Sequence, residues 1–83
     1  MVVYFTKYAN DKFDILKRHG FVVSKSQVED ALKNPDAIDE SRAPLYFAQK
    51  SLDKKRVLKV VYKKEEGAIK VITFYPGVNY EQE

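Results

Sequence analysis

The feature that most constrains the fold is a pair of β-type runs, RVLKVVYK at 56–63 and AIKVITFY at 68–75. Both runs are rich in β-branched and aromatic residues, which favour extended strands. The residues between them are few, and Gly67 fits the left-handed position of a three-residue loop at 65–67. The two runs therefore predict an antiparallel hairpin.

The loop length decides which side chains share a face of this hairpin. A three-residue loop turns a set of apolar and aromatic side chains toward the core: Leu58, Val60, Tyr62, Ile72 and Phe74. The opposite face then carries a mixed set: Lys59, Val61, Lys63, Val71, Thr73 and Tyr75. In this register Lys59 lies across from Thr73 and diagonal to Tyr75. A two-residue loop would shift the register and send Tyr75 to the core side.

The remaining elements follow from periodicity and from cap residues. The patterns predict a strand at 2–5, helices at 7–19 and 25–33, and a further strand at 45–52. Thr6 caps the first helix and Gly20 ends it, while Ser24 opens a capping box with Gln27. Segment 36–44 is expected to be a polar connection, and Pro76-Gly77 to end the last strand.

The element order predicts an α+β domain, β-α-α-β-β-β, in which an antiparallel sheet carries two helices packed on one face. The 83 residues form a single domain, 1–83, with 76–83 as a C-terminal tail. The chain has no cysteine and one histidine, so we expect no metal site and no cofactor. No apolar run approaches the roughly 18 residues of a membrane span, and a cytoplasmic protein is expected.

Three segments in this order carry a family resemblance: KRHG at 17–20, SKSQVEDALKNPD at 24–36 and RVLKVVYKKEEGAIKVITFYP at 56–76. Their order and spacing resemble the RelE/ParE superfamily of small bacterial and archaeal toxins, and most closely its BrnT-like branch with an allied family of unknown function. The likeness spans about residues 7–76. It implies a sheet that helices cover on one side and leave open on the other.

The resemblance also implies a function. RelE-type members cut mRNA on the ribosome without metal, using basic and tyrosine side chains, and an antitoxin holds them inactive. ParE-type relatives act on DNA gyrase. The expected partners are therefore RNA or the ribosome, together with a small antitoxin protein. A homodimer is compatible with the sequence. The alternative is a non-catalytic module of the same fold that binds a protein through its sheet edge or open face.

Metal-free RNA cleavage needs cations to stabilise charge on the phosphate and groups that move protons. Lys59 and Tyr75 are the predicted catalytic pair, and His19 is a further candidate for proton transfer. The net charge of +3 arises from a concentration of basic residues between 50 and 70. Arg56 and Lys63 are the predicted phosphate contacts. Additional nucleic-acid contacts are expected from Lys50, Lys54 and Lys55.

Each of these assignments has a purely structural alternative. Alternating strand lysines protect a sheet from aggregation, and the run of Lys54, Lys55 and Arg56 is more typical of a solvated turn. His19 falls inside the apolar arc of the first helix immediately before Gly20. That position favours an imidazole at least half buried that bonds the free carbonyls of the helix end. The catalytic alternative treats His19 as an acid or base with a pKa near neutrality.

Overall fold

The computed structural model describes residues 2–78, which form two helices and a five-stranded sheet. The elements run in the order β1 (Val2–Phe5), α1 (Lys7–Arg18), α2 (Lys25–Lys33), β2 (Ala37–Asp39), β3 (Tyr46–Ser51), β4 (Arg56–Glu65) and β5 (Ala68–Val78). The strand order across the sheet is β1-β5-β4-β3-β2. The α+β class and the pair of helices agree with the sequence prediction.

The sheet differs from the prediction in three places. It is mixed rather than antiparallel, because β1 pairs with β5 in parallel. Within the segment expected to be a polar connection, β2 forms and pairs with β3. Strand β5 continues through Pro76 and Gly77 to Val78, so residues 76–78 do not belong to a tail. Proline is tolerated there because β1 pairs only as far as Val71 and leaves that stretch of β5 at an edge. The rest of the expected tail, 79–83, lies outside the described residues.

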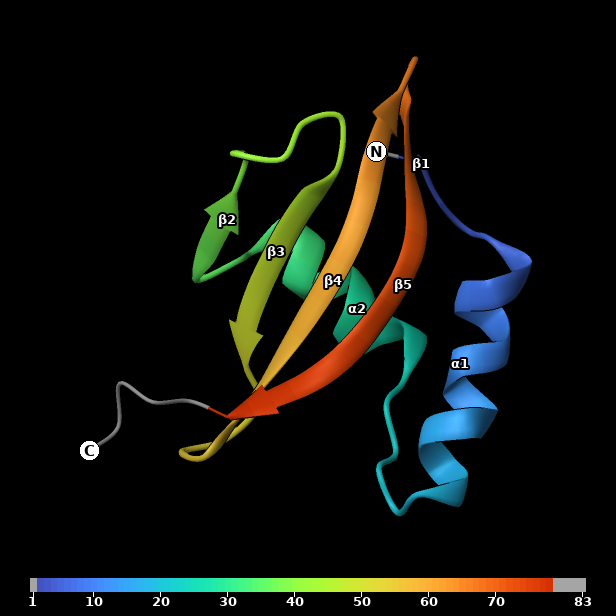
Figure 1. The fold of residues 1–83 in the computed structure, drawn as a ribbon, viewed down its shortest axis with the longest axis vertical. Helices are drawn as coiled ribbons and strands as arrows, with labels where there is room; N and C mark the ends of the chain where they lie inside the picture. The colour runs from blue at the N-terminus through green and yellow to red at the C-terminus, as the bar shows by residue number, and fades with distance from the viewer. Residues whose placement is uncertain (1, 79–83) are drawn as a thin grey trace.

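The helices cover one face of the sheet, as Figure 1 shows with α2 behind β3 and β4 and α1 beside β5. The core lies between these layers and is apolar throughout: Ala9, Leu16, Val23, Val28, Ala31, Leu58, Val60, Val71 and Phe74 are buried in it. Neither α1 nor α2 has the length and apolar character needed to cross a bilayer. Within residues 2–78 no helix covers the opposite face of the sheet, and we call this face the open face.

The N-terminal caps of both helices form as the sequence predicts. The Thr6 hydroxyl accepts a hydrogen bond from the Ala9 N–H at 3.1 Å. At α2, the Ser24 hydroxyl accepts from the Gln27 N–H at 3.1 Å, and the Gln27 side chain accepts from the Ser24 N–H at 2.9 Å. These bonds satisfy N–H groups that have no partner inside a helix.

The C-terminal end of α1 is closed by backbone groups and not by the imidazole of His19. The N–H groups of Gly20 and Phe21 donate to the carbonyls of Lys17 and Leu16, with Gly20 at φ 82°. This is a Schellman motif. The backbone of His19 is no longer helical, at φ −95° and ψ 14°, so a helical wheel does not predict where its side chain points. His19 is exposed. The predicted packed imidazole cap is therefore wrong, while the predicted role of Gly20 is confirmed.

The β4–β5 hairpin has a shorter turn than predicted. Glu65 pairs with Ala68, which leaves a two-residue turn of Glu66 and Gly67, with Gly67 at φ 66°. This turn shifts the first part of β5 by one residue, so Val71 pairs with Tyr62 and is buried in the core instead of lying on the open face. The prediction for Val71 is wrong because the loop length was wrong.

A β-bulge adds a second one-residue shift for the rest of β5, and this second shift restores the predicted faces. The register changes between Val61 and Tyr62, where the partners jump from Thr73 to Val71 and leave Ile72 as the extra residue. Beyond the bulge, Phe74 pairs with Val60 on the core side. Tyr75 therefore lies on the open face, directly across from Lys59. The two shifts add to two residues, so Tyr75 keeps its predicted face, but the predicted pairing of Lys59 with Thr73 is wrong.

The closure of α1 yields a stability prediction. Gly20→Ala should lower the free energy of unfolding by about 1 kcal/mol, because a side chain is disfavoured at φ 82°. His19→Ala should change it by less than about 0.5 kcal/mol, because only the backbone of His19 contributes to the helix end. Urea unfolding of both variants measures the difference. A larger loss for His19→Ala than for Gly20→Ala would contradict this account.

Candidate functional site

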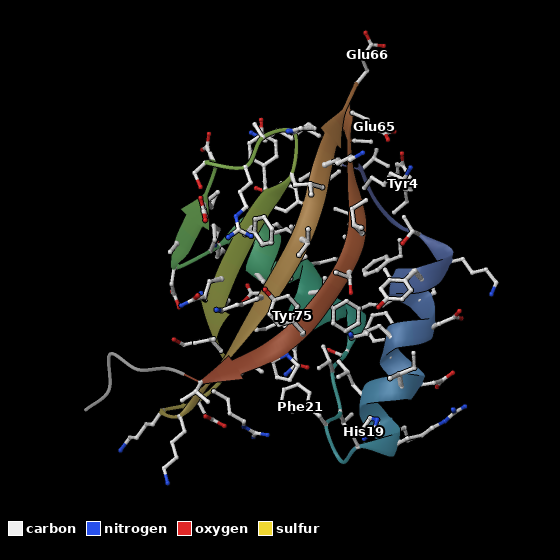
Figure 2. All side chains as sticks on the ribbon, in the orientation of Figure 1. Tyr4, His19, Phe21, Glu65, Glu66 and Tyr75 are labelled. Carbon is white, nitrogen blue, oxygen red and sulfur yellow. The ribbon has the colours of Figure 1, made fainter. Side chains whose placement is uncertain are left out.

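A row of side chains crosses the open face through Lys59 and Tyr75. The pairings place Ala37 of β2, Gln49 of β3, Lys59 of β4 and Tyr75 of β5 side by side. Adjacent strands lie about 4.8 Å apart, so the row extends over roughly 14 Å. Figure 2 shows Tyr75 over the sheet at its exposed face. A cation, an amide and a phenol therefore lie next to one another.

A second, more apolar row runs beside the first. It consists of Asp39, Phe47, Val61 and Thr73 on the same four strands. Val61 is buried although it belongs to the open face, and the Thr73 hydroxyl is buried without a hydrogen-bond partner within residues 2–78. The side chains above this row therefore shield it from solvent. Its two apolar members, Phe47 and Val61, are neighbours of Gln49 and Lys59 along β3 and β4.

The two rows form most of a groove of about 280 Å³. The lining residues come from β2, β3, β4, β5 and the β2–β3 connection: Ala37, Ile38, Asp39, Arg42, Phe47, Ala48, Gln49, Lys59 and Tyr75. Lys59 is half-buried, whereas Tyr75 is 36% exposed. The volume is at the lower end of the range for small-molecule sites, so the groove fits one compact group.

The β2–β3 connection holds Arg42 above the groove. The Asp39 carboxylate accepts two hydrogen bonds from Ser41, one from its N–H at 2.9 Å and one from its hydroxyl at 2.6 Å. The Arg42 guanidinium lies over the Phe47 ring, 5.4 Å from its centroid. The Ser41 hydroxyl, followed by its N–H and by the charge of Arg42, lowers the pKa of Asp39. The Asp39 carboxylate therefore stabilises the start of the β2–β3 connection through these hydrogen bonds.

Gly77 makes room for the side chain of Lys59. A Cβ at position 77 would lie 3.3 Å from Lys59 Cε and 3.2 Å from Val57 Cγ2. The stem of Lys59 thus lies against the backbone of β5 beyond Tyr75. A larger residue at position 77 would displace this stem, because Val57 is buried and has little freedom to move.

The other predicted site residues are spread over the molecule. Lys50 belongs to the helix side of the sheet, where its Nζ lies 3.9 Å from the Asp36 carboxylate. Arg56 pairs with Asp53 at 2.9 Å and lies over the Phe21 ring. These contacts engage both residues away from the groove, so the structure does not bring them together with Lys59. The reason is strand alternation, which sends Lys50 to the opposite face from Gln49.

Three further candidates also lie outside the groove. Lys54 and Lys55 are exposed in the β3–β4 turn. The Asp53 carboxylate orders this turn by accepting hydrogen bonds from the N–H groups of Lys55 and Arg56 at 2.9 and 2.8 Å. Figure 2 shows His19 at the end of α1, away from Tyr75. His19 is therefore not positioned to move a proton at Lys59 and Tyr75.

Lys63 is on the open face, in a third row nearer the hairpin turn. Lys63 pairs with Lys70, which in turn pairs with Tyr4 of β1. The Tyr4 hydroxyl donates to the Glu65 carboxylate, and Lys70 Nζ lies 3.8 Å from the same carboxylate. The hydrogen bond to Glu65, together with desolvation, raises the pKa of Tyr4. Tyr4 is 39% exposed.

Sequence reasoning missed Arg42, Phe47 and Gln49 as groove residues. Phe47 and Gln49 alternate along β3 and pair with Val61 and Lys59, so a correct β3–β4 register would have identified them. Nothing in the local pattern around Arg42 signals its position, because the hydrogen bonds of Asp39 and Ser41 determine it. The groove thus combines two cations with two aromatic rings and an amide. In the described part of the chain no cluster of metal-binding side chains forms.

No family model, curated protein or solved structure matches this chain.

The Asp39–Ser41 contact yields a prediction that NMR can test. The carboxyl of Asp39 should titrate below 3.8, because Ser41 stabilises its charged form. The charged carboxylate of Asp39 therefore stabilises the folded protein above pH 3.8, and this stabilisation is lost as the pH falls through the lowered pKa. Ser41→Ala should move the pKa of Asp39 toward 3.8, because only the N–H donor remains. An unchanged titration midpoint in Ser41→Ala would contradict the assigned role of the hydroxyl.

Proposed function

We propose that this chain is a RelE-type domain that binds single-stranded RNA in the groove of its open face. The observation that carries the proposal is the direct pairing of Lys59 with Tyr75 in a groove beneath Arg42. Proteins that bind single strands combine cations for the phosphates with aromatic rings on which bases stack. The groove offers both kinds of group within a small volume.

The two cations suit a phosphate, and the free tyrosine suits a base. Phe47 is already covered by the Arg42 guanidinium, whereas Tyr75 is among the exposed large side chains, at 36% exposure for the residue. Stacking of a base on an aromatic ring contributes about 1–3 kcal/mol. Lys59 lies beside Tyr75 and is placed to contact the phosphate of the same nucleotide.

Binding has more support here than cleavage. Lys59 would stabilise negative charge on a phosphate, and Tyr75 would donate a hydrogen bond or proton. A base for the ribose 2′-hydroxyl is also required. Asp39 is the one carboxylate among the described lining residues, and Ser41 already donates two hydrogen bonds to it. RNA binding is therefore the core of the proposal, and metal-independent cleavage is its extension.

A second function is favoured by the β2 edge of the sheet. All three residues of β2 are exposed, and the Ile38 side chain is 45% exposed. An exposed edge strand is a template for pairing with a strand of another protein. The second candidate is therefore a non-catalytic module that binds a protein partner, including an antitoxin, by adding a strand at β2.

Lys59→Ala tests the RNA proposal. The variant should weaken binding to a labelled single-stranded RNA of roughly ten nucleotides and should reduce the log–log salt slope by about 0.7 for each lost phosphate contact. Lys17→Ala is the matched control, because Lys17 is exposed on α1 and its loss changes the net charge equally. Fluorescence anisotropy at several salt concentrations measures both quantities. Equal effects of the two variants, or no binding at low salt, would refute the proposal.

The same RNA, incubated in EDTA and resolved on a gel, tests cleavage. Products that form with the unaltered protein and are lost with Lys59→Ala would extend the function to metal-independent cleavage. The rate should fall on the order of 10²- to 10³-fold when the electrostatic group is removed. Growth arrest on controlled expression should then depend on Lys59. An uncleaved strand would limit the function to binding.

A further inference from the structure

We propose that the bound RNA runs lengthwise along β4, from Lys59 in the groove to a second phosphate site at Lys63 and Lys70. This inference rests on the proposed RNA-binding function and adds the length and direction of the ligand. The second site lies at the hairpin end of the open face, where Figure 2 shows Tyr4 and Glu65 well away from Tyr75.

The first observation is that two lysines stand directly opposite each other. Lys63 of β4 and Lys70 of β5 are register partners on the open face. Like charges directly opposite each other destabilise a pair of strands. Glu65 offsets part of this repulsion through Lys70, at 3.8 Å. No ion pair engages Lys63 within residues 2–78, and its side chain is exposed. An anion between the two ammonium groups would relieve the remaining repulsion.

The second observation is that this row repeats the chemistry of the groove. In the groove, a lysine of β4 lies beside a tyrosine of β5. In the hairpin-end row, the lysines of β4 and β5 lie beside Tyr4 of β1, a residue that is 39% exposed. Each row therefore offers cations for a phosphate and an aromatic ring for a base. Such alternation along one path is typical of surfaces that bind single strands.

The spacing of the rows determines the class of ligand. Lys59 and Lys63 are four residues apart on the same face of β4, which corresponds to about 13 Å at the rise of a strand. Phe47 and Val61 lie on the open face between them. One nucleotide occupies one row, so a ligand that contacts both rows is an oligonucleotide. The predicted substrate is therefore a short single strand and not a free nucleotide.

The glutamate at the hairpin end limits the second site to one phosphate. Glu65 accepts the hydrogen bond of Tyr4 and lies near Lys70, so its charge partly neutralises this row. The net charge available to an anion there comes mainly from Lys63. Removal of Lys63 should therefore cost about one phosphate contact. Tyr4 should keep its position in the Lys63→Ala variant, because its hydrogen bond to Glu65 remains.

The experiment compares RNA lengths across two matched variants. Affinities are measured by anisotropy competition for a mononucleotide, a trinucleotide and a strand of roughly ten nucleotides. Lys63→Ala removes the second site. Lys64→Ala is the control, because Lys64 is the next residue of β4 but pairs with Ile69 on the helix side and lies over the Tyr46 ring. The two variants have the same net charge, and their melting temperatures verify folding.

The unaltered protein should bind the longer strands more tightly than the mononucleotide. Lys63→Ala should lose this gain in affinity, whereas Lys64→Ala should keep it. The salt slope for the long strand should fall by about 0.7 in Lys63→Ala alone. Equal affinity for all lengths, or equal effects of the two variants, would overturn the path along β4 while leaving binding in the groove intact. No binding of any RNA would instead refute the proposed function.

Discussion

The bulge at Ile72 is the constraint on which both faces of the sheet depend. Val71 and Phe74 both enter the core although they are three residues apart, a spacing that regular alternation forbids. The extra residue makes this spacing compatible with one sheet. It also returns Tyr75 to the face of Lys59, so the packing of the core and the composition of the groove result from the same local irregularity.

The helices and their caps were predictable because their signals are local. Thr6, Ser24 and Gly20 act through backbone groups within a few residues, and the structure confirms each of them. Strand pairing depends on contacts between distant segments, so the parallel partner of β1 and the edge strand β2 carried no comparable signal. The prediction for the His19 side chain failed because a helical wheel assumes helical geometry, whereas α1 ends at Arg18.

Lysine-rich sequence and lysine-rich surface are not equivalent in this protein. The basic residues between 50 and 70 are close in sequence, yet strand alternation and turns distribute them over both faces of the sheet. Lys59 and Lys63 share the open face, whereas Lys50 and Lys64 belong to the helix side. Within the strand predicted at 56–63, alternation predicted the shared face of Lys59 and Lys63. The second cation of the groove, Arg42, belongs to the β2–β3 connection, where it lies over the Phe47 ring. No periodicity in the sequence encodes this position.

The pairing of β1 with β5 also bears on how this chain folds. The Tyr4–Glu65 and Thr6–Ile72 hydrogen bonds join positions 61 and 66 residues apart in sequence. Such non-local contacts carry a large loop-closure entropy and slow the folding of small domains. β1 cannot pair until β5 is present, because β5 is its partner in the sheet. During synthesis, β1 therefore emerges before its pairing partner β5 and must remain without it until β5 has been made.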